Sequence, residues 1–97
     1  LQGLQLKNVK TGEETQLPVD GMFVFVGYEP QNSFLPAGLE LDPQGFIITD
    51  CEMRTNLPGL FAAGDIRSKM CRQVTTAVGD GATAATAAFT YLEQLDA

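Results

Sequence analysis

The chain has 97 residues, of which 12 are acidic and 6 basic, and it contains no histidine, so its formal net charge is −6. This balance excludes a nucleic-acid partner or an anionic membrane surface, both of which need clustered Lys and Arg, and it excludes any mechanism that needs a histidine. Hydrophobic residues make up 44%, which is typical of a globular chain, and no apolar run approaches the ~20 residues of a membrane-spanning helix. We expect one ordinary domain at most and, because the chain opens at Leu1 rather than Met, a piece of a longer protein.

The two cysteines, Cys51 and Cys71, are too few for a disulfide-stapled secreted scaffold. Their spacing matches neither a CxxC redox motif nor half of a zinc site. We therefore expect two free thiols, no metal site and a cytoplasmic location.

The first 27 residues predict a three-stranded β-meander. Over residues 4–10 the apolar residues fall first at every second position and then shift by one, which predicts a half-buried strand with a bulge near Asn8. The turn residues Thr11-Gly12-Glu13 follow, and residues 14–17 would complete a hairpin. Residues 22–26 (Met-Phe-Val-Phe-Val) are apolar at every position, which is typical of a strand buried on both faces.

Residues 28–45 change in composition and predict a hinge or linker, since Pro, Gly, Asn and Ser interrupt them too often for a regular element. Within them, Asp42-Pro43-Gln44-Gly45 is typical of a β-turn with Pro at its second position. Two short apolar strands are expected next, at residues 46–49 and 60–63.

The last segment predicts a long helix over residues 73–95. Alanines are dense there, and apolar residues recur at spacings of three and four, the period of one helical face. Gly79 and Gly81 should weaken the helix by about 1 kcal/mol each. They indicate either that another backbone or a ligand comes very close, or that the first turn is frayed.

A candidate binding site lies between the strand ending at Gly64-Asp65 and the helix opening near Gln73. Ligands of open α/β folds bind outside the carboxyl ends of the strands, and Gly64 would let the chain turn without a Cβ in the way. The Asp65 carboxylate could accept hydrogen bonds from sugar-like hydroxyls, and the helix opening attracts an anion. The alternative is that Asp65 is an ordinary loop or N-cap residue.

Two motifs carry a resemblance to a known family. Residues 55–65 (TNLPGLFAAGD) resemble the second FAD-binding motif of flavoproteins with two dinucleotide-binding domains. Residues 72–82 (RQVTTAVGDGA) narrow the resemblance to the low-molecular-weight thioredoxin reductases. Residues 6–13 and 19–27 resemble the end of the pyridine-nucleotide domain of that family, so the resemblance covers essentially the whole chain.

The resemblance implies an α/β fold class, namely the C-terminal part of such a flavoprotein, with a β-meander, a hinge, two short strands and a long terminal helix. Residues 1–27 would be the last strands of the pyridine-nucleotide domain. Residues 28–45 would be the hinge, and residues 46–97 the C-terminal segment of the FAD-binding domain.

The resemblance also implies a partial FAD site. Asp65 would bind the ribityl and pyrophosphate region, and Arg72, Gln73 and Val74 would lie beside the flavin ring, with Gly64 turning the chain against the cofactor. The full-length enzyme would pass electrons from NAD(P)H through FAD to a cysteine pair and then to thioredoxin or a similar redox protein. We also expect a homodimer or other self-association.

The chain contains neither a GxGxxG nor a CxxC motif. We therefore expect it to be catalytically inactive alone. Two alternatives stay open: a reductase of the same architecture that lacks the cysteine pair and reduces ferredoxin or flavodoxin, and a non-catalytic interaction module. The first would differ by the absence of CxxC upstream, and the second would be favoured by a start codon directly before Leu1.

Overall fold

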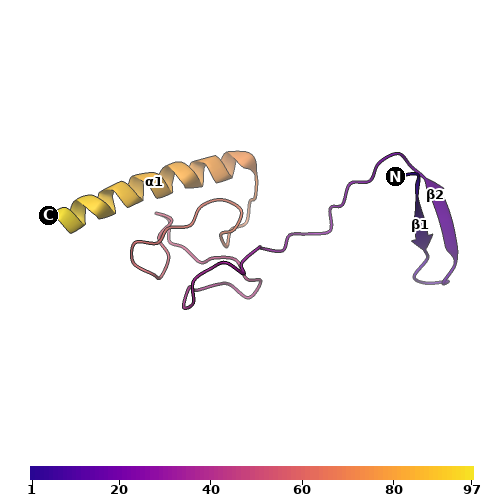
Figure 1. The fold of residues 1–97 in the computed structure, drawn as a ribbon, viewed down its shortest axis with the longest axis horizontal. Coiled ribbons are helices and arrows are strands. Elements are labelled where there is room, and N and C mark those ends of the chain that lie inside the picture. The colour runs from indigo at the N-terminus through magenta and orange to yellow at the C-terminus, as the bar shows by residue number, and fades with distance from the viewer.

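A computed structural model describes residues 1–97 and contains three regular elements (Figure 1). They are strand β1 (Gly3–Lys7), strand β2 (Glu14–Pro18) and helix α1 (Val74–Asp96). The Cα radius of gyration is 20.2 Å and the extents are 69 × 26 × 21 Å, whereas a compact chain of this size would have a radius of about 13 Å. The difference arises because the hairpin stands at one end, joined to the remainder by an extended segment.

The expected hairpin is confirmed, but its first strand ends at Lys7 and not at residue 10, because residues 8–13 form the turn. β1 and β2 pair antiparallel, with Leu4 opposite Leu17 and Lys7 opposite Glu14. The connecting turn is built by Asn8, whose side-chain oxygen accepts the N–H groups of the second and third residues after it, at 2.9 and 3.2 Å. The hairpin is therefore specified locally, by turn chemistry and strand period.

The expected third strand is wrong. Residues 22–26 form no strand, and Phe23, Phe25 and Val26 are 88%, 86% and 90% exposed. A strand that is apolar on both faces needs a sheet that is covered on both sides. The only sheet in the structure is the two-stranded hairpin, and residues 22–26 lie in the extended segment that leads away from it (Figure 1). The sequence pattern thus identifies a segment with no sheet to enter among these 97 residues.

The expectation of two short strands at residues 46–49 and 60–63 is also wrong. Each segment forms only isolated β-bridges and no continuous strand. The bridged pairs are Leu41 with Ile47, Ile47 with Arg67, and Arg54 with Phe61. No ladder continues from any of them, since the neighbouring residues turn away into loops. The β-turn at residues 42–45 is confirmed, with the Gly45 N–H donating to the Asp42 carbonyl at 2.9 Å.

The small core lies where these loops meet α1. Its buried apolar residues are Phe46, Ile47, Met53, Ala62 and Ala87. The rings of Phe61 and Tyr91 meet edge to face, with centroids 6.1 Å apart and planes at 73°. The helix is thus anchored to the loops along one face, through small residues and one aromatic pair.

The helix expected over residues 73–95 is confirmed, displaced by one residue at each end. It is regular from its first turn, so the frayed start is wrong, and a Cβ at Gly79 or Gly81 would meet nothing within 4 Å, so no other residue of these 97 approaches closely there. Its outer face carries exposed apolar side chains: Val74, Val78, Phe89, Leu92 and Leu95. No helix in the structure combines the length and hydropathy needed to cross a bilayer.

Candidate functional site

The loop from Gly64 to Gln73 leads into α1, includes the bridge of Arg67 with Ile47, and contains most of the candidate site residues. Gly64 is buried and has a φ of +84°, a conformation that L side chains rarely adopt. Its carbonyl accepts the N–H of Arg67 at 3.1 Å, which closes a turn. Glycine is therefore required here by the backbone, and the turn displays Asp65 at the surface.

The side chain of Asp65 is exposed and makes no hydrogen bond or ion pair within the chain. Its backbone carbonyl is occupied, accepting the Arg72 Nε–H at 2.9 Å. The carboxylate is thus held at a defined place by its backbone while its oxygens stay available to a ligand.

Arg72 is fixed by contacts on three sides. It donates from Nε to the Asp65 carbonyl and from Nη2 to the Arg67 carbonyl at 3.0 Å. Its guanidinium carbon lies 3.7 Å from the centroid of the Phe46 ring, within cation–π range. A planar fork satisfies all these contacts at once, which an ammonium group could not do.

The start of α1 follows directly. Gln73 is its N-cap, in an extended conformation, and the Gln73 N–H donates to the Thr76 hydroxyl oxygen at 3.1 Å. No acidic residue lies in the first turn, so the positive end of the helix dipole is not neutralised by the helix itself. Val74 is 80% exposed there.

Asp65 and Arg72 line the same surface pocket, of about 300 Å³. The other lining residues come from the hinge and the core: Tyr28, Glu29, Pro30, Gln31, Phe34, Phe46 and Ile66. Gln73 and Val74 lie beyond it, at the helix opening. The structure thus brings Gly64, Asp65 and Arg72 together and leaves Gln73 and Val74 next to them on the open side.

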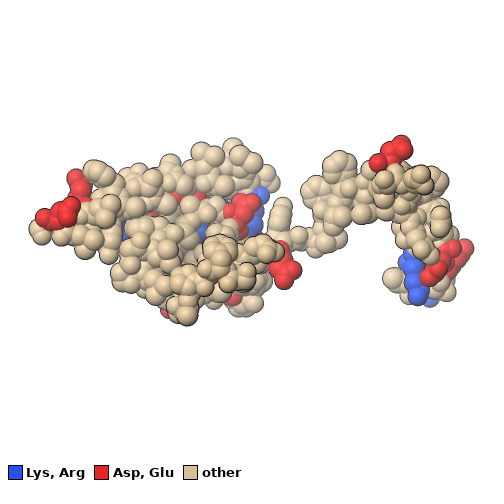
Figure 2. All heavy atoms as spheres, in the orientation of Figure 1, with Lys and Arg blue, Asp and Glu red and all other residues tan.

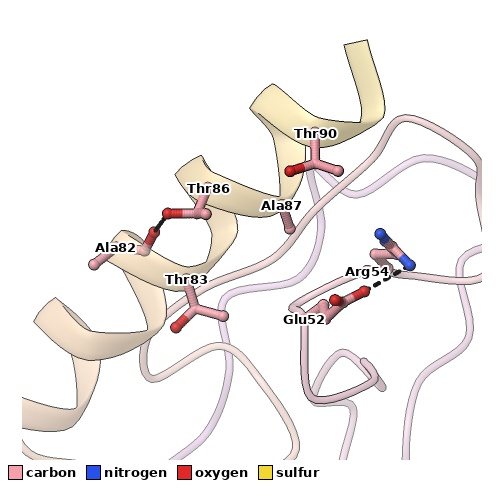
Figure 3. Close-up of a pocket in the computed structure, with 7 residues that line it drawn as sticks. All are labelled: Glu52, Arg54, Ala82, Thr83, Thr86, Ala87 and Thr90. Atoms are coloured by element: carbon pink, nitrogen blue, oxygen red, sulfur yellow. Dashed lines mark hydrogen bonds and ion pairs between the residues drawn. The ribbon is translucent and has the colours of Figure 1, made fainter. Parts of the chain in front are cut away.

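A second pocket, of about 350 Å³, lies between α1 and the loop of residues 52–54 (Figure 3). Two of its polar groups have partners: the Arg54 Nη1 pairs with Glu52 at 2.6 Å, and the Thr86 hydroxyl donates to the Ala82 carbonyl at 3.0 Å. The Arg54 Nε is buried there without a hydrogen-bond partner.

Sequence reasoning missed a group of charged residues that ties the loop to the helix. One oxygen of Asp80 accepts from Lys69 Nζ at 2.7 Å and from Arg67 Nη1 at 2.8 Å, and also from the backbone N–H of Gly64 at 3.0 Å. Desolvation alone would raise the pKa of Asp80, but the hydrogen bonds from Lys69, Arg67 and Gly64 outweigh it and lower the pKa to about 2.

A signal for this cluster was present in the sequence. Asp80 lies four residues before Ala84 and eight before Ala88, so it falls on the inward apolar face of the helix. A carboxylate on such a face indicates a paired, buried charge. Figure 2 shows basic side chains near the start of α1 with acidic side chains directly beside them.

The sequence matches a known family over most of its length. Residues 2–81 match the family described as pyridine nucleotide-disulphide oxidoreductase. The chain is 50% identical over 94 residues to the thioredoxin reductase of Listeria monocytogenes, an overlap that covers 96% of this chain and 29% of that protein. It is 52% identical over 90 residues to the thioredoxin reductase of Treponema pallidum, covering 93% of this chain and 29% of that protein.

Solved structures agree with the sequence comparison. Thioredoxin reductase from Lactococcus lactis superposes with a TM-score of 0.76 at 50% identity, covering 96% of this chain and 31% of that one. The enzyme from Streptococcus pyogenes gives a TM-score of 0.77 at 45% identity, covering 96% and 30%. The chain therefore spans under a third of the length of these relatives, and the hairpin and long helix match part of their fold, so the expected α/β fold class is confirmed. The chain belongs to the pyridine nucleotide-disulphide oxidoreductase family.

Proposed function

We propose that this chain supplies part of the FAD site of a flavin-dependent NAD(P)H:disulfide oxidoreductase that reduces thioredoxin. The observation that carries the proposal is the exposed, unpaired Asp65 carboxylate on a glycine turn, in one pocket with the immobilised Arg72. The identity of 50% to a thioredoxin reductase supports the choice of substrate.

The residues of this loop fit FAD. The φ of +84° at Gly64 lets the backbone approach a ligand closely, and the free oxygens of Asp65 can accept hydrogen bonds from ribityl or ribose hydroxyls. The unneutralised start of α1 and the cationic Arg72 favour negative charge on a ligand beside them. When bound, FAD supplies the two-electron redox chemistry.

Each of these side chains would act by binding or bordering the cofactor. Asp65 would bind and orient the cofactor through its hydroxyls. Arg72 would form one side of the site and place a positive charge there, while Gln73 and Val74 would border the flavin ring at the helix opening. None of these residues forms a covalent bond with substrate, and the disulfide chemistry requires a cysteine pair outside these residues. We infer that the chain alone is inactive.

The test uses the full-length protein that contains this chain, purified without added flavin. We expect bound FAD, NAD(P)H-dependent reduction of thioredoxin, and a requirement for a cysteine pair in that protein. A protein that binds FAD and oxidises NAD(P)H but reduces ferredoxin or flavodoxin and has no such pair would replace the substrate assignment. A folded protein that does not bind FAD would overturn the proposal.

A further inference from the structure

The Asp80 carboxylate connects two segments that the proposed function requires to be in fixed positions. A single oxygen of Asp80 accepts the Gly64 N–H at 3.0 Å, Arg67 Nη1 at 2.8 Å and Lys69 Nζ at 2.7 Å. Asp80 lies in the second turn of α1, whereas its partners all belong to the loop before the helix. The helix therefore holds the loop through this one atom.

The cluster is shielded from solvent. The exposed fractions of the Asp80, Arg67 and Lys69 side chains are 12%, 12% and 11%. Arg67 also donates from Nε to the Thr49 hydroxyl at 2.8 Å, so the connection reaches a third segment. A shielded carboxylate that faces two cations cannot be removed without leaving like charges close together.

The geometry transmits this connection to the ligand pocket. Gly64 is the residue before Asp65, and its N–H is bound directly to Asp80. The Arg67 carbonyl accepts Arg72 Nη2 at 3.0 Å, so the same network places Arg72. Both pocket residues thus depend on Asp80 through one intermediate residue each, and Asp80 itself does not line the pocket.

We propose that Asp80 is a positioning residue for the FAD site, which holds the Gly64–Arg72 loop against α1 so that Asp65 and Arg72 face the cofactor. This inference rests on the proposed function, since it presupposes that FAD binds at this loop. Lys69 and Arg67 are the cationic partners through which it acts.

The experiment compares variants of the full-length protein. Asp80→Asn keeps the shape and one acceptor oxygen but loses the charge, and the double variant Asp80→Asn, Lys69→Met also removes one of the two unmatched cations. We expect Asp80→Asn to raise the FAD dissociation constant at least about tenfold and to shift the visible spectrum of the remaining bound flavin toward that of free FAD. We expect the double variant to recover much of both losses. Asp96→Asn, an exposed acid on the same helix, is the matched control and should leave both unchanged.

The outcomes separate the inference from the proposed function. If the wild-type protein binds FAD, and Asp80→Asn lowers thermal stability while the dissociation constant and the flavin spectrum stay at wild-type values, the positioning role is wrong. If Asp80→Asn does not fold, the double variant decides. A double variant with wild-type FAD affinity and spectrum would support the positioning role. A folded double variant whose FAD dissociation constant is still raised at least about tenfold would contradict it. A wild-type protein without flavin would refute the proposed function itself.

Discussion

The guanidinium carbon of Arg72 lies 3.7 Å from the centre of the Phe46 ring, while its nitrogens donate to the carbonyls of Asp65 and Arg67. The side chain thus links the buried core to the surface loop that carries Asp65, the candidate ligand-binding residue. An exposed, flexible arginine would have no such fixed place. Arg72 is therefore held by the core residue Phe46 as well as by the loop.

Replacing Arg72 with lysine tests this contact in the full-length protein. Lysine keeps the charge but loses the planar fork, so one carbonyl hydrogen bond and the ring stacking are lost, at about 1 kcal/mol each. Together these losses correspond to roughly thirtyfold, so we expect FAD to dissociate about ten- to thirtyfold faster, as followed by the rise in fluorescence of released flavin. Arg54→Lys is the control, because Arg54 pairs with the exposed Glu52 outside this pocket. Equal dissociation rates for the two variants would show that Arg72 does not contact the bound cofactor.

Asp65→Ala should weaken FAD retention more than Asp50→Ala. A hydrogen bond to a charged group contributes about 1.5–3 kcal/mol, which corresponds to at least about a tenfold change in dissociation constant. Asp50 has a structural role instead, since its carboxylate accepts the N–H groups of Glu52 and Arg54, both at 2.9 Å. A third variant, Asp20→Ala, provides an exposed control. Flavin content of the purified proteins is the measurement, and equal loading of the Asp65 and Asp20 variants would remove Asp65 from the site.

Asp80 should make stability depend on pH in the acid range. Its pKa in the folded protein is about 2, below the ordinary value of 3.8, so the carboxylate stabilises the fold fully above pH 3.8 and this contribution is lost as the pH falls toward 2. The shift corresponds to roughly 2 kcal/mol, and solvent screening removes little of it because the Asp80 side chain is only 12% exposed.

The measurement for Asp80 is urea unfolding of the flavin-free full-length protein at pH 5 and pH 2. The loss of free energy of unfolding between the two pH values should be about 2 kcal/mol larger in the wild type than in Asp80→Asn. Parallel losses in both proteins would mean that this carboxylate is not held charged by its partners.

The isolated 97-residue chain should self-associate. Residues 22–26 and the outer face of α1 are exposed apolar surfaces, and covering even ~400 Å² would contribute roughly 10 kcal/mol before association costs. Light scattering should therefore report species larger than a monomer, and Phe23→Ser with Phe25→Ser should reduce them. The same chain should bind negligible FAD, since it lacks a GxGxxG motif. A well-folded monomer carrying stoichiometric flavin would contradict both expectations.

The sequence predicted the elements whose determinants are local. The hairpin follows from strand period and turn chemistry, and α1 follows from helix period and alanine content. The helix and the second strand were located within one residue, whereas the first strand ends at Lys7, three residues before the expected end at residue 10. Residues 22–26 were misassigned because a two-sided apolar run identifies a strand only where neighbouring strands exist. The spacing of apolar residues shows which side chains need burial, but it does not show whether a neighbouring strand is present to bury them.

The candidate site was predicted in part for the same reason. Gly64 and Asp65 could be identified because a Gly-Asp pair directly follows an apolar run in the sequence. The Asp80 cluster was missed because its members are 11 to 16 residues apart and meet only when the loop folds back on the helix. A carboxylate on the apolar face of a helix was the signal that sequence reasoning should have used.

The most direct test of the central claim is the flavin content of the full-length protein, measured by its visible absorption before and after anaerobic addition of NADPH or NADH. If these residues form part of an FAD site, the protein should carry equimolar FAD that is bleached by the reduced nicotinamide, and Asp65→Ala should lower the flavin content. A folded, colourless protein that takes up no FAD when the cofactor is supplied would contradict the claim.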